Sequence, residues 1–372
     1  MKTVVRQNSD FLFGFEALMT NPNGDPDQEN RPRMDYETAT ALVSDARRKR
    51  DCRDFLKRKG YKIFVDTIAD NKVPMDQMFK MIIKEWLSEE TKILQLFKDV
   101  PILEEKWNQI FGNANGGFQE KYFNFLNDSK GKNKSDSKEK EKKDTNEKEK
   151  KKKFVEFNNL FLTEIIKDSL IDIRLFGSAM AVEGVSRTYT GPVQITWGYS
   201  LHPVELVKSN TITSIMNEGN STFGKKHKLH YAFIAHYGTI NKYSALQTGM
   251  TENDREVFRK ALVQGLMSNQ TDSKQGQTPL FYIEVQYKTE FDGYLGDLRR
   301  FCNVSWEEPV RNLQNLAVDF SSFTQVIEKM KMKGYIEKTI GWLHPLSDQS
   351  YLKNMPIFDE TVDLWTPLSA GE

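Results

Sequence analysis

The N-terminal part of this chain contains the run Thr20-Asn21-Pro22-Asn23-Gly24-Asp25-Pro26-Asp27, in which nearly every residue from Asn21 to Asp27 is a turn former. Proline fixes φ, glycine permits positive φ, and Asn and Asp side chains bond to nearby backbone amides, so the run predicts a rigid loop. A strand-like segment, residues 10–19, precedes it, and a predicted helix rich in Arg and Lys, residues 38–59, follows it. This order suits a site for a polyanion backbone, although an ordinary connection explains the turn chemistry equally well.

The composition indicates a soluble protein with a hydrophobic core. Hydrophobic residues make up 38% of the 372, and no apolar run approaches the roughly 20 residues that span a bilayer. Residues 1–10 lack the apolar segment of a signal peptide, and Cys52 and Cys302 are too few for a disulfide framework. We therefore expect a cytoplasmic protein with no membrane contact.

The formal charge of +1 averages two unlike regions. Residues 130–153 contain 12 Lys against 6 Asp and Glu, a local charge of +6, so the rest of the chain carries 1 − 6 = −5. This segment has no hydrophobic residue and is predicted to be a disordered, solvated insertion, with loose contact to nucleic acid as the alternative. Any basic surface on the folded part must come from local clustering.

The hydrophobic pattern predicts an α+β fold. Strands are predicted at residues 10–19, 61–65, 170–180, 229–237 and 279–287, with shorter alternating segments at 191–206, where Val193, Ile195 and Trp197 share one face. Helices are predicted at residues 38–59, 75–97 and 251–266, the last with Thr251 as N-cap and Asp254 in its first turn. This order suggests a sheet of the ferredoxin or RRM type with many additions.

The helix predicted at 38–59 is the first candidate for binding phosphates. Arg50, Arg53 and Lys57 follow i, i+3, i+7 spacing and share one face, and Lys49 is an i, i+4 neighbour of Arg53. A stripe of this kind can bind successive phosphates of a nucleic acid. A solvated helix face, neutralised by acids on the same helix, is the alternative.

Two further segments carry basic or aromatic residues. Residues 208–228 are polar and predict a long hairpin whose far end is basic, with Lys225, Lys226 and Lys228. Residues 186–190 include Arg187, which could bind phosphate beside a tyrosine that stacks on a base. Both segments are equally compatible with ordinary surface loops.

No motif identifies an enzyme. The five histidines have no spacing typical of a metal site, and no phosphate-binding glycine loop is present. Asp25 and Asp27 are the best acid pair, and they could bind Mg²⁺ or assist RNA cleavage, but their turn role explains them without catalysis. We expect no catalytic residue, no cofactor and no metal.

Several motifs occur in the same order as in a known family. The chain resembles the CRISPR Cascade backbone subunit, the seventh Cas protein family, in the branch of types I-B and I-C (the Csh and Csd types). The resemblance rests on Asn21 to Asp27 followed by Pro32-Arg33, on Lys49-Arg50-Asp51-Cys52-Arg53, Asp172-Ile173-Arg174-Leu175-Phe176-Gly177, Gly191-Pro192-Val193-Gln194, Ser200-Leu201-His202-Pro203 and Thr248-Gly249-Met250-Thr251. Ala39 and Ala41 depart from it, since they stand where the family's Thr-Gly-x-Gly run has glycine.

The resemblance implies a single Cascade-backbone-type domain, residues 1–372. It would have an RRM-like (ferredoxin-like) palm, helical fingers inserted at about 66–129 and 154–169, and a β-hairpin thumb at about 208–228. Its implied RNA-binding residues are Asn21, Asn23, Arg31, Arg33, Lys49, Arg50, Arg53, Lys57, Arg187, Lys225, Lys226 and Lys228.

The implied function is a non-catalytic scaffold that oligomerises along CRISPR RNA in a type I Cascade surveillance complex, with type I-B the closer fit. Its partners would be the guide RNA, further copies of itself, the small, large and repeat-processing subunits, and target DNA through the guide heteroduplex. The alternative is a metal-dependent target-RNA endonuclease that uses Asp25 and Asp27. A generic single-strand RNA chaperone is a third, weaker interpretation.

Overall fold

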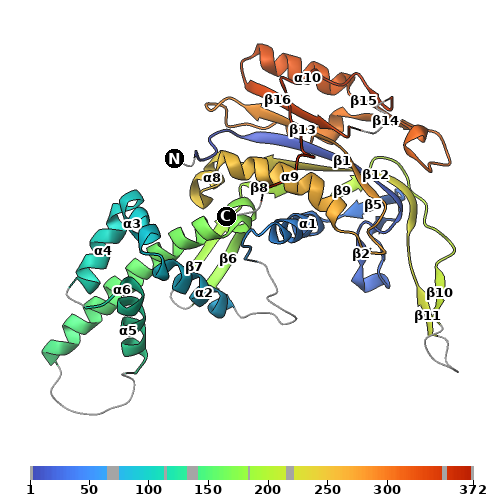
Figure 1. The fold of residues 1–372 in the computed structure, drawn as a ribbon. Helices are drawn as coiled ribbons and strands as arrows, with labels where there is room; N and C mark the ends of the chain where they lie inside the picture. The colour runs from blue at the N-terminus through green and yellow to red at the C-terminus, as the bar shows by residue number, and fades with distance from the viewer. Residues whose placement is uncertain are drawn as a thin grey trace. The chain divides into compact units, whose positions relative to one another are not determined.

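A computed structural model describes residues 3–64, 75–112, 115–131, 141–182, 185–214, 222–345 and 350–369 (Figure 1). The chain forms two compact units, which are described separately. The first comprises Met1–Ile63, Arg174–Gly177 and Thr190–Glu372, and the second comprises Phe64–Ile173 and Ser178–Tyr189. Within the described residues, no helix has the length and apolar content needed to cross a membrane.

A large, mainly antiparallel sheet is the frame of the first unit. Its strand order is β18-β16-β13-β1-β12-β9-β5-β4, and β8 also pairs with β12. β1 lies between β12 and β13 and is antiparallel to both, so the N-terminal strand is central. The strands are β1 (Ser9–Thr20), β4 (Met34–Asp35), β5 (Thr40–Val43), β8 (Val193–Ile195), β9 (Gly198–Ser200), β12 (Leu229–Ile240), β13 (Gln277–Tyr287), β16 (Ile336–Leu343) and β18 (Glu360–Thr361).

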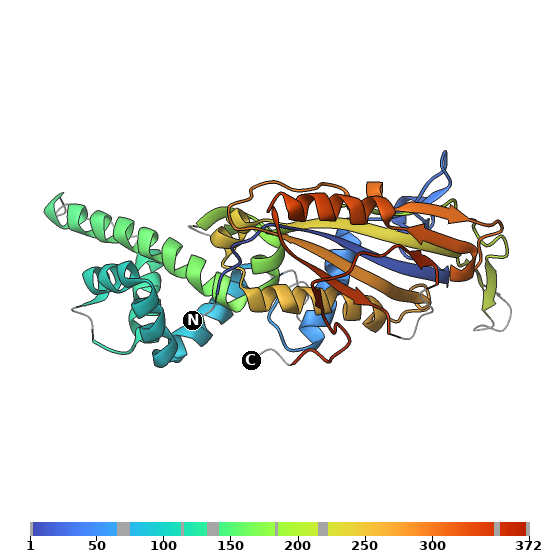
Figure 2. The ribbon, with the colours of Figure 1, turned by 90° about the horizontal axis from the view of Figure 1, so that it is seen from above.

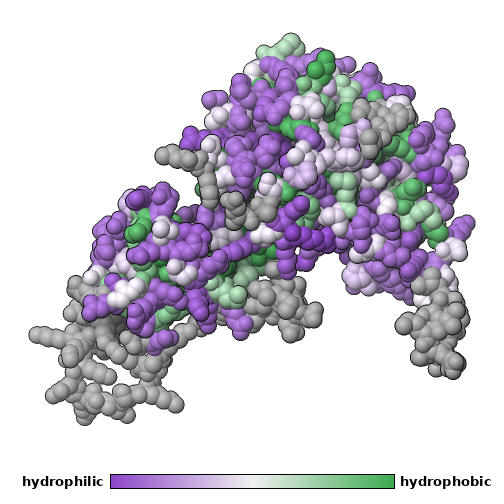
Figure 3. All heavy atoms as spheres, viewed as in Figure 1, coloured by the Kyte–Doolittle hydropathy of each residue, from purple (hydrophilic) through white to green (hydrophobic). Residues whose placement is uncertain are grey.

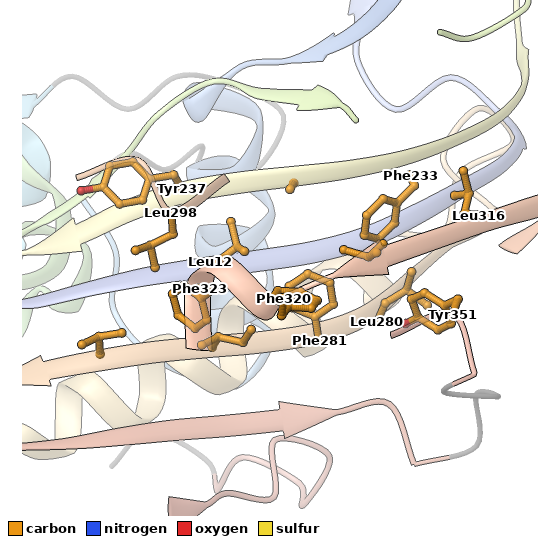
Figure 4. Close-up of a cluster of buried hydrophobic side chains, with 14 of the residues drawn as sticks. Leu12, Phe233, Tyr237, Leu280, Phe281, Leu298, Leu316, Phe320, Phe323 and Tyr351 are labelled. Carbon is orange, nitrogen blue, oxygen red and sulfur yellow. The ribbon is translucent and has the colours of Figure 1, made fainter. Parts of the chain in front are cut away.

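Both faces of this sheet are covered, as Figures 1 and 2 show from two directions. On one face, α1 (Asp45–Arg58) packs against α9 (Glu252–Ser268), and Phe11 of β1 makes an edge contact with Phe258 at 5.5 Å. On the other face, α10 (Ser321–Met332) covers a hydrophobic cluster that includes Leu12, Phe281 and Phe320 (Figure 4). Successive β1 residues therefore point into opposite cores, as the two-residue period of a strand requires.

Shorter elements complete the first unit. The hairpin of β10 and β11 and the small hairpin of β2 and β3 are separate two-stranded pairs, and β14, β15 and β17 form a three-stranded sheet. These elements are β2 (Gly24–Asp25), η1 (Pro26–Gln28), β3 (Arg31–Pro32), β10 (Thr211–Ser214), β11 (Thr222–Lys225), α8 (Lys242–Thr248), η2 (Leu298–Phe301), β14 (Asn303–Trp306), η3 (Leu313–Asn315), β15 (Leu316–Asp319) and β17 (Leu352–Lys353).

The second unit is mainly helical. Its core is rich in aromatic rings, with Trp107 against Phe111 at 4.2 Å and Phe157 stacked on Phe161 at 5.1 Å. α7 passes from this unit into the first, and β6 and β7 pair with each other. The elements are α2 (Met75–Ser88), α3 (Glu90–Asp99), α4 (Pro101–Phe111), α5 (Phe118–Gly131), α6 (Glu141–Ser169), α7 (Ile171–Phe176), β6 (Gly177–Val182) and β7 (Val185–Thr190).

The predicted α+β class is confirmed, as are its long buried strands. β1, β12 and β13 cover the predicted segments 10–19, 229–237 and 279–287. The predicted start of α9 is also confirmed. Thr251 is its N-cap, and the hydroxyl of Thr251 and the carboxylate of Asp254 form a reciprocal capping box.

Four predicted elements were wrong in type or extent. Residues 40–43 form β5 rather than the start of a helix, because Ala41 and Val43 are buried in the sheet and Ser44 supplies the helix cap. Most of 170–180 is helix α7 followed by β6, and residues 61–64 form no regular strand, Val65 lying outside the described residues. The helix predicted at 75–97 is two helices, α2 and α3.

The lysine-rich segment also differs from its predicted disorder. Residues 141–153 begin α6, and residues 130 and 131 end α5, while 132–140 lie outside the described residues. Lys and Glu are good helix formers, and Glu–Lys pairs at i, i+4 stabilise an exposed helix. Lys153 and Glu149 form such a pair at 3.2 Å.

Candidate nucleic-acid interface

The turn-rich run folds into a compact loop between β1 and β4. Gly24 pairs with Pro32 and Asp25 with Arg31, and η1 closes the hairpin. A Cβ on Gly24 would lie 1.8 Å from the Asn30 side-chain oxygen, so only glycine fits this turn without rearrangement. The missing Cβ at position 24 therefore lets the loop close tightly against Asn30.

The start of the loop is tied to the segment between α9 and β13. Lys274 Nζ donates to the carbonyl oxygens of Asn21 at 2.7 Å and Pro22 at 3.2 Å, and the Asn21 amide donates to the Ser273 carbonyl at 2.9 Å. Burial, with Arg47 and Arg48 nearby, lowers the pKa of Lys274 to about 8. The ammonium replaces water as the partner of two loop carbonyls.

The end of the loop is tied to helix α1. Asn23 Oδ1 accepts hydrogen bonds from the Ser44 amide and hydroxyl, and the Arg33 amide donates to the Asn23 carbonyl at 2.8 Å. Ser44 is the N-cap of α1, and its hydroxyl accepts from the Arg47 amide at 3.2 Å. Asn21 and Asn23 are both buried, so these two predicted RNA-binding side chains shape the loop from inside.

Helix α1 divides its basic residues between the interior and the surface. Arg48 is buried over the ring of Phe15, at 4.9 Å from its centroid, and pairs with Asp51 at 2.7 Å. Asp51 also accepts hydrogen bonds from Arg47 and Asn269, so one carboxylate joins α1 to the start of the segment after α9. These contacts fix the rotation of the helix about its axis.

The predicted phosphate-binding residues of α1 are held by local partners. Lys49 pairs with Asp45 at 3.0 Å and Arg50 with Asp54 at 2.7 Å. Arg53 lies over the Phe176 ring at 5.1 Å. Lys57 is exposed near the C-terminal end. Their positive charge is therefore partly balanced by acids on the same helix.

The basic hairpin meets the loop at its base. Lys225 pairs with Glu29 at 3.4 Å, His227 lies 3.9 Å from the same carboxylate, and Lys226 pairs with Asp272 at 2.8 Å. Glu29 has a left-handed backbone, with φ at 50°, which follows the end of η1. Three distant segments thus meet here: the loop, the hairpin base and the turn before β13.

The structure brings together most of the predicted residues of the first unit. Arg31 pairs with Glu29 at 3.8 Å, and Arg33 pairs with Asp25 at 3.4 Å. Lys228 follows the hairpin, and its carbonyl accepts from the Val207 amide. Arg187 lies on β7, in the second unit, and is not placed with them.

Sequence reasoning missed two members of this surface. Lys274 carries no local motif, and only the folded chain shows its contact with Asn21, 253 positions away. Trp197 was predicted to share the face of Val193 and Ile195, but it is 45% exposed whereas both of these are buried. β8 ends at Ile195, and the connection to β9 breaks the alternation.

The acid pair lies in the same loop. Asp25 caps η1, its carboxylate accepting from the Asp27 amide at 3.2 Å, and also pairs with Arg33. Within the part of the chain that the structure describes, no three His, Cys, Asp or Glu side chains are grouped to hold a metal ion.

In the view of Figure 3, hydrophobic side chains on the surface are scattered among polar ones.

The fold and the site define an α+β protein in which a rigid loop after the central strand meets a basic helix and a basic hairpin. The chain matches the family described as CRISPR-associated protein Cas7 over residues 7–321. It therefore belongs to the Cas7 family.

Similar proteins are known by sequence and by structure. The "CRISPR-associated protein Cas7" of Haloferax volcanii is 25% identical over 390 residues, with 97% of this chain and 93% of the relative covered. Two solved chains, "CRISPR RNA-guided surveillance complex, pre-nicking" and "CRISPR RNA-guided surveillance complex", give TM-scores of 0.48 and 0.44 at 13% and 11% identity, with 96% of both chains covered in each case.

Proposed function

We propose that this chain is a non-catalytic backbone subunit that binds CRISPR RNA. Several copies would line up along one guide RNA in a type I Cascade complex, of the I-B branch, together with the other Cascade subunits. The guide bases would pair with target DNA while the protein holds the RNA backbone. Membership of the Cas7 family supports this proposal.

One observation of the site carries the proposal: the loop, the hairpin base and the turn before β13 meet and bring cations together. Arg31 and Arg33 come from the loop, Lys225 and Lys226 from the hairpin base, and Lys274 from the turn. Four of these cations are paired with carboxylates of the same chain, which RNA phosphates would replace. Charge-assisted bonds to phosphate are favourable, and the loop is already rigid before RNA arrives.

The parts of the fold fit the proposal as follows. The large sheet with α1 and α9 would be an RRM-like palm, and helices α2 to α6 would be the fingers. The hairpin of β10 and β11 would be the thumb, whose base is joined by the Val207 amide to the Lys228 carbonyl at 2.9 Å.

The test uses the chain assembled with its partner subunits and CRISPR RNA. Binding should weaken steeply as salt rises, because phosphate contacts release counterions. Changing Lys49, Arg50 and Arg53 together to Ala should weaken assembly equally for every spacer sequence. The matched control removes three exposed lysines, Lys329, Lys333 and Lys353, and should leave binding unchanged. A loss that depends on spacer sequence, or no RNA binding by the wild type, would contradict the proposal.

The nuclease alternative has its own test. Assembled complex is incubated with complementary RNA and Mg²⁺, and the Asp25→Asn variant is compared with the wild type. We expect intact RNA in both cases, because the Asp25 carboxylate is engaged by the Asp27 amide and by Arg33. Periodic cuts that disappear in the variant would favour the endonuclease instead.

A further inference from the structure

Trp197 is a large exposed aromatic side chain on the short connection between β8 and β9. Its exposed fraction is 45%, whereas Val193 and Ile195 on the preceding strand are at most 6% exposed. Burying an indole ring would be favourable by the hydrophobic effect, so the folded chain forgoes that gain here. The backbone of this connection is held by buried contacts, so the fold itself keeps the Trp197 side chain exposed.

A buried arginine fixes the backbone under Trp197. Arg299 Nη1 donates to the Trp197 carbonyl at 2.7 Å, and Arg299 also lies over the Tyr199 ring at 4.0 Å. Asp297 holds the other side of the guanidinium, at 2.7 Å. A Cβ on Gly198 would lie 2.7 Å from the His236 ring, so the chain is also pressed against β12. The backbone at Trp197 is therefore held in place by Arg299 and by packing against His236.

A cation from the end of the loop, Arg33, lies over the ring of Trp197. The Arg33 guanidinium is 5.9 Å from the ring centroid, within the range of a cation–π contact. Arg33 is itself 29% exposed and pairs with Asp25 at 3.4 Å. An accessible aromatic ring next to an arginine is the combination that single-strand binding proteins use, the ring for a base and the cation for the backbone.

We propose that Trp197 is a stacking platform for one nucleobase of the single-stranded guide RNA, with Arg33 binding the phosphate next to that base. This rests on the proposed function. Every base has a π-face, so the platform accepts any spacer sequence, as a guide-binding subunit requires. The cations around it favour RNA over a second copy of the chain as the occupant.

The experiment measures the dissociation constant of the assembled complex for CRISPR RNA at several salt concentrations. Trp197→Ala should weaken binding roughly 5- to 100-fold for each bound copy, the range expected for one lost base stack per copy, without changing the slope against salt. Trp197→Phe should restore most of the affinity. Arg33→Ala should instead lower the slope by about one counterion for each bound copy. Trp306→Ala is the matched control, because Trp306 is 41% exposed on a different sheet, and it should have no effect.

A scan with guide RNAs that lack the base at one fixed position in every repeat, moved by one position from guide to guide, locates the stack. At the correct position in each repeat, the abasic guide should bind wild type and Trp197→Ala equally, since the stacking partner is already missing. Equal affinities of wild type and Trp197→Ala for intact RNA would overturn the stacking role and leave the proposed function standing. If Trp197→Ala bound every abasic guide more weakly than wild type did, the stacking role would be overturned in favour of a contact between copies of the chain. No binding of RNA by the wild type would overturn both proposals.

Discussion

Asn23 Oδ1 accepts two hydrogen bonds from Ser44, one from the backbone amide at 2.8 Å and one from the hydroxyl at 3.0 Å. Ser44 caps α1, so this contact joins the turn-rich loop to the basic helix. The two sequence features that first suggested a polyanion site are therefore one structural element. We therefore expect a change at Asn23 to affect the first turn of the helix.

Asn23→Ala should lower the free energy of unfolding by about 1–3 kcal/mol, because it leaves the Ser44 amide without its acceptor in a partly buried site. Asn23→Asp keeps the acceptor oxygens and should recover most of the loss. Urea denaturation of the purified chain measures both. Asn303→Ala, at an exposed position on β14, is the control and should change stability by less than about 0.5 kcal/mol. Equal stability of Asn23→Ala and wild type would show that the contact does not hold the loop.

Ala39 has a left-handed backbone, with φ at 54°, at a position where the family resemblance leads us to expect glycine. A residue with a Cβ is strained by roughly 1–2 kcal/mol there, which exceeds the entropic cost of glycine. Ala39→Gly should therefore stabilise the chain by about 0.5–1 kcal/mol, seen as a higher melting temperature. The second departure from the family pattern, Ala41, gives the opposite sign. Ala41 is buried in β5, and Ala41→Gly should destabilise by about 1–2 kcal/mol through the lost methyl group and the added chain entropy.

Glu284 is a fully buried carboxylate between β13 and α9. Arg259 pairs with it at 2.8 Å, Tyr282 donates to it at 2.7 Å, and Arg255 lies 4.0 Å away. Burial would raise its pKa, but the two arginines outweigh burial and lower the pKa to about 2. Glu284→Gln removes the buried counter-charge of two guanidinium groups whose other carboxylate partners, Glu256 and Glu252, are exposed, and should cost about 3–5 kcal/mol.

A second partner of Arg259 supplies the control for that variant. Glu256 pairs with Arg259 at 2.9 Å, but its side chain is 53% exposed. Glu256→Gln should cost less than about 1 kcal/mol, because exposed pairs are screened by water. Chemical denaturation of the two variants side by side gives the comparison. Similar losses in both would mean that burial does not set the strength of this network.

The parts of the fold that could be predicted are those fixed by local pattern. The continuous apolar sequence of β1 and the capping box of Thr251 and Asp254 each determine their own structure. β5 and α7 were missed because their local patterns indicated other elements: residues 40–43 were assigned to the following helix, and the alternation within 170–180 predicted a strand. Residues 40–43 become a strand through pairing with β9, in which Leu42 faces Tyr199, more than 150 residues away in the chain.

The candidate site was predictable in its charges but not in its partners. Loop and hairpin composition indicated Arg31, Arg33 and Lys225, yet nothing local indicated that Glu29 would neutralise Lys225, 196 positions away. Trp197 was missed for a related reason. The end of β8 and the support from Arg299 decide its exposure, and both depend on tertiary contacts.

His236 should make the stability of the chain depend on pH below about 6.5. It is fully buried on β12, its ring stacks on Phe15 at 6.0 Å, and its Nδ1–H donates to the Thr196 carbonyl at 3.0 Å. Burial, and then the charge of Arg48 with a smaller effect of Arg299, lowers its pKa to about 3. The folded chain thus keeps this ring neutral, whereas the unfolded chain binds a proton below a pH of about 6.5.

The sign of the effect follows from proton binding. Between about pH 6.5 and 3 the unfolded state binds the extra proton, so stability falls as pH falls, with a slope approaching about 1.4 kcal/mol per pH unit. His236→Asn replaces the buried ring that stacks on Phe15, so the variant should be less stable than wild type at pH 7. Its side chain keeps an N–H donor but cannot be protonated, so the variant should lose less stability than wild type on acidification to pH 5. Denaturant titrations at pH 5, 6 and 7 measure both slopes. His344→Asn is the control, since burial lowers the pKa of this partly exposed histidine too, and it should flatten the slope less. If His236→Asn and wild type lost stability in parallel, the buried neutral ring would not be the source of the acid sensitivity.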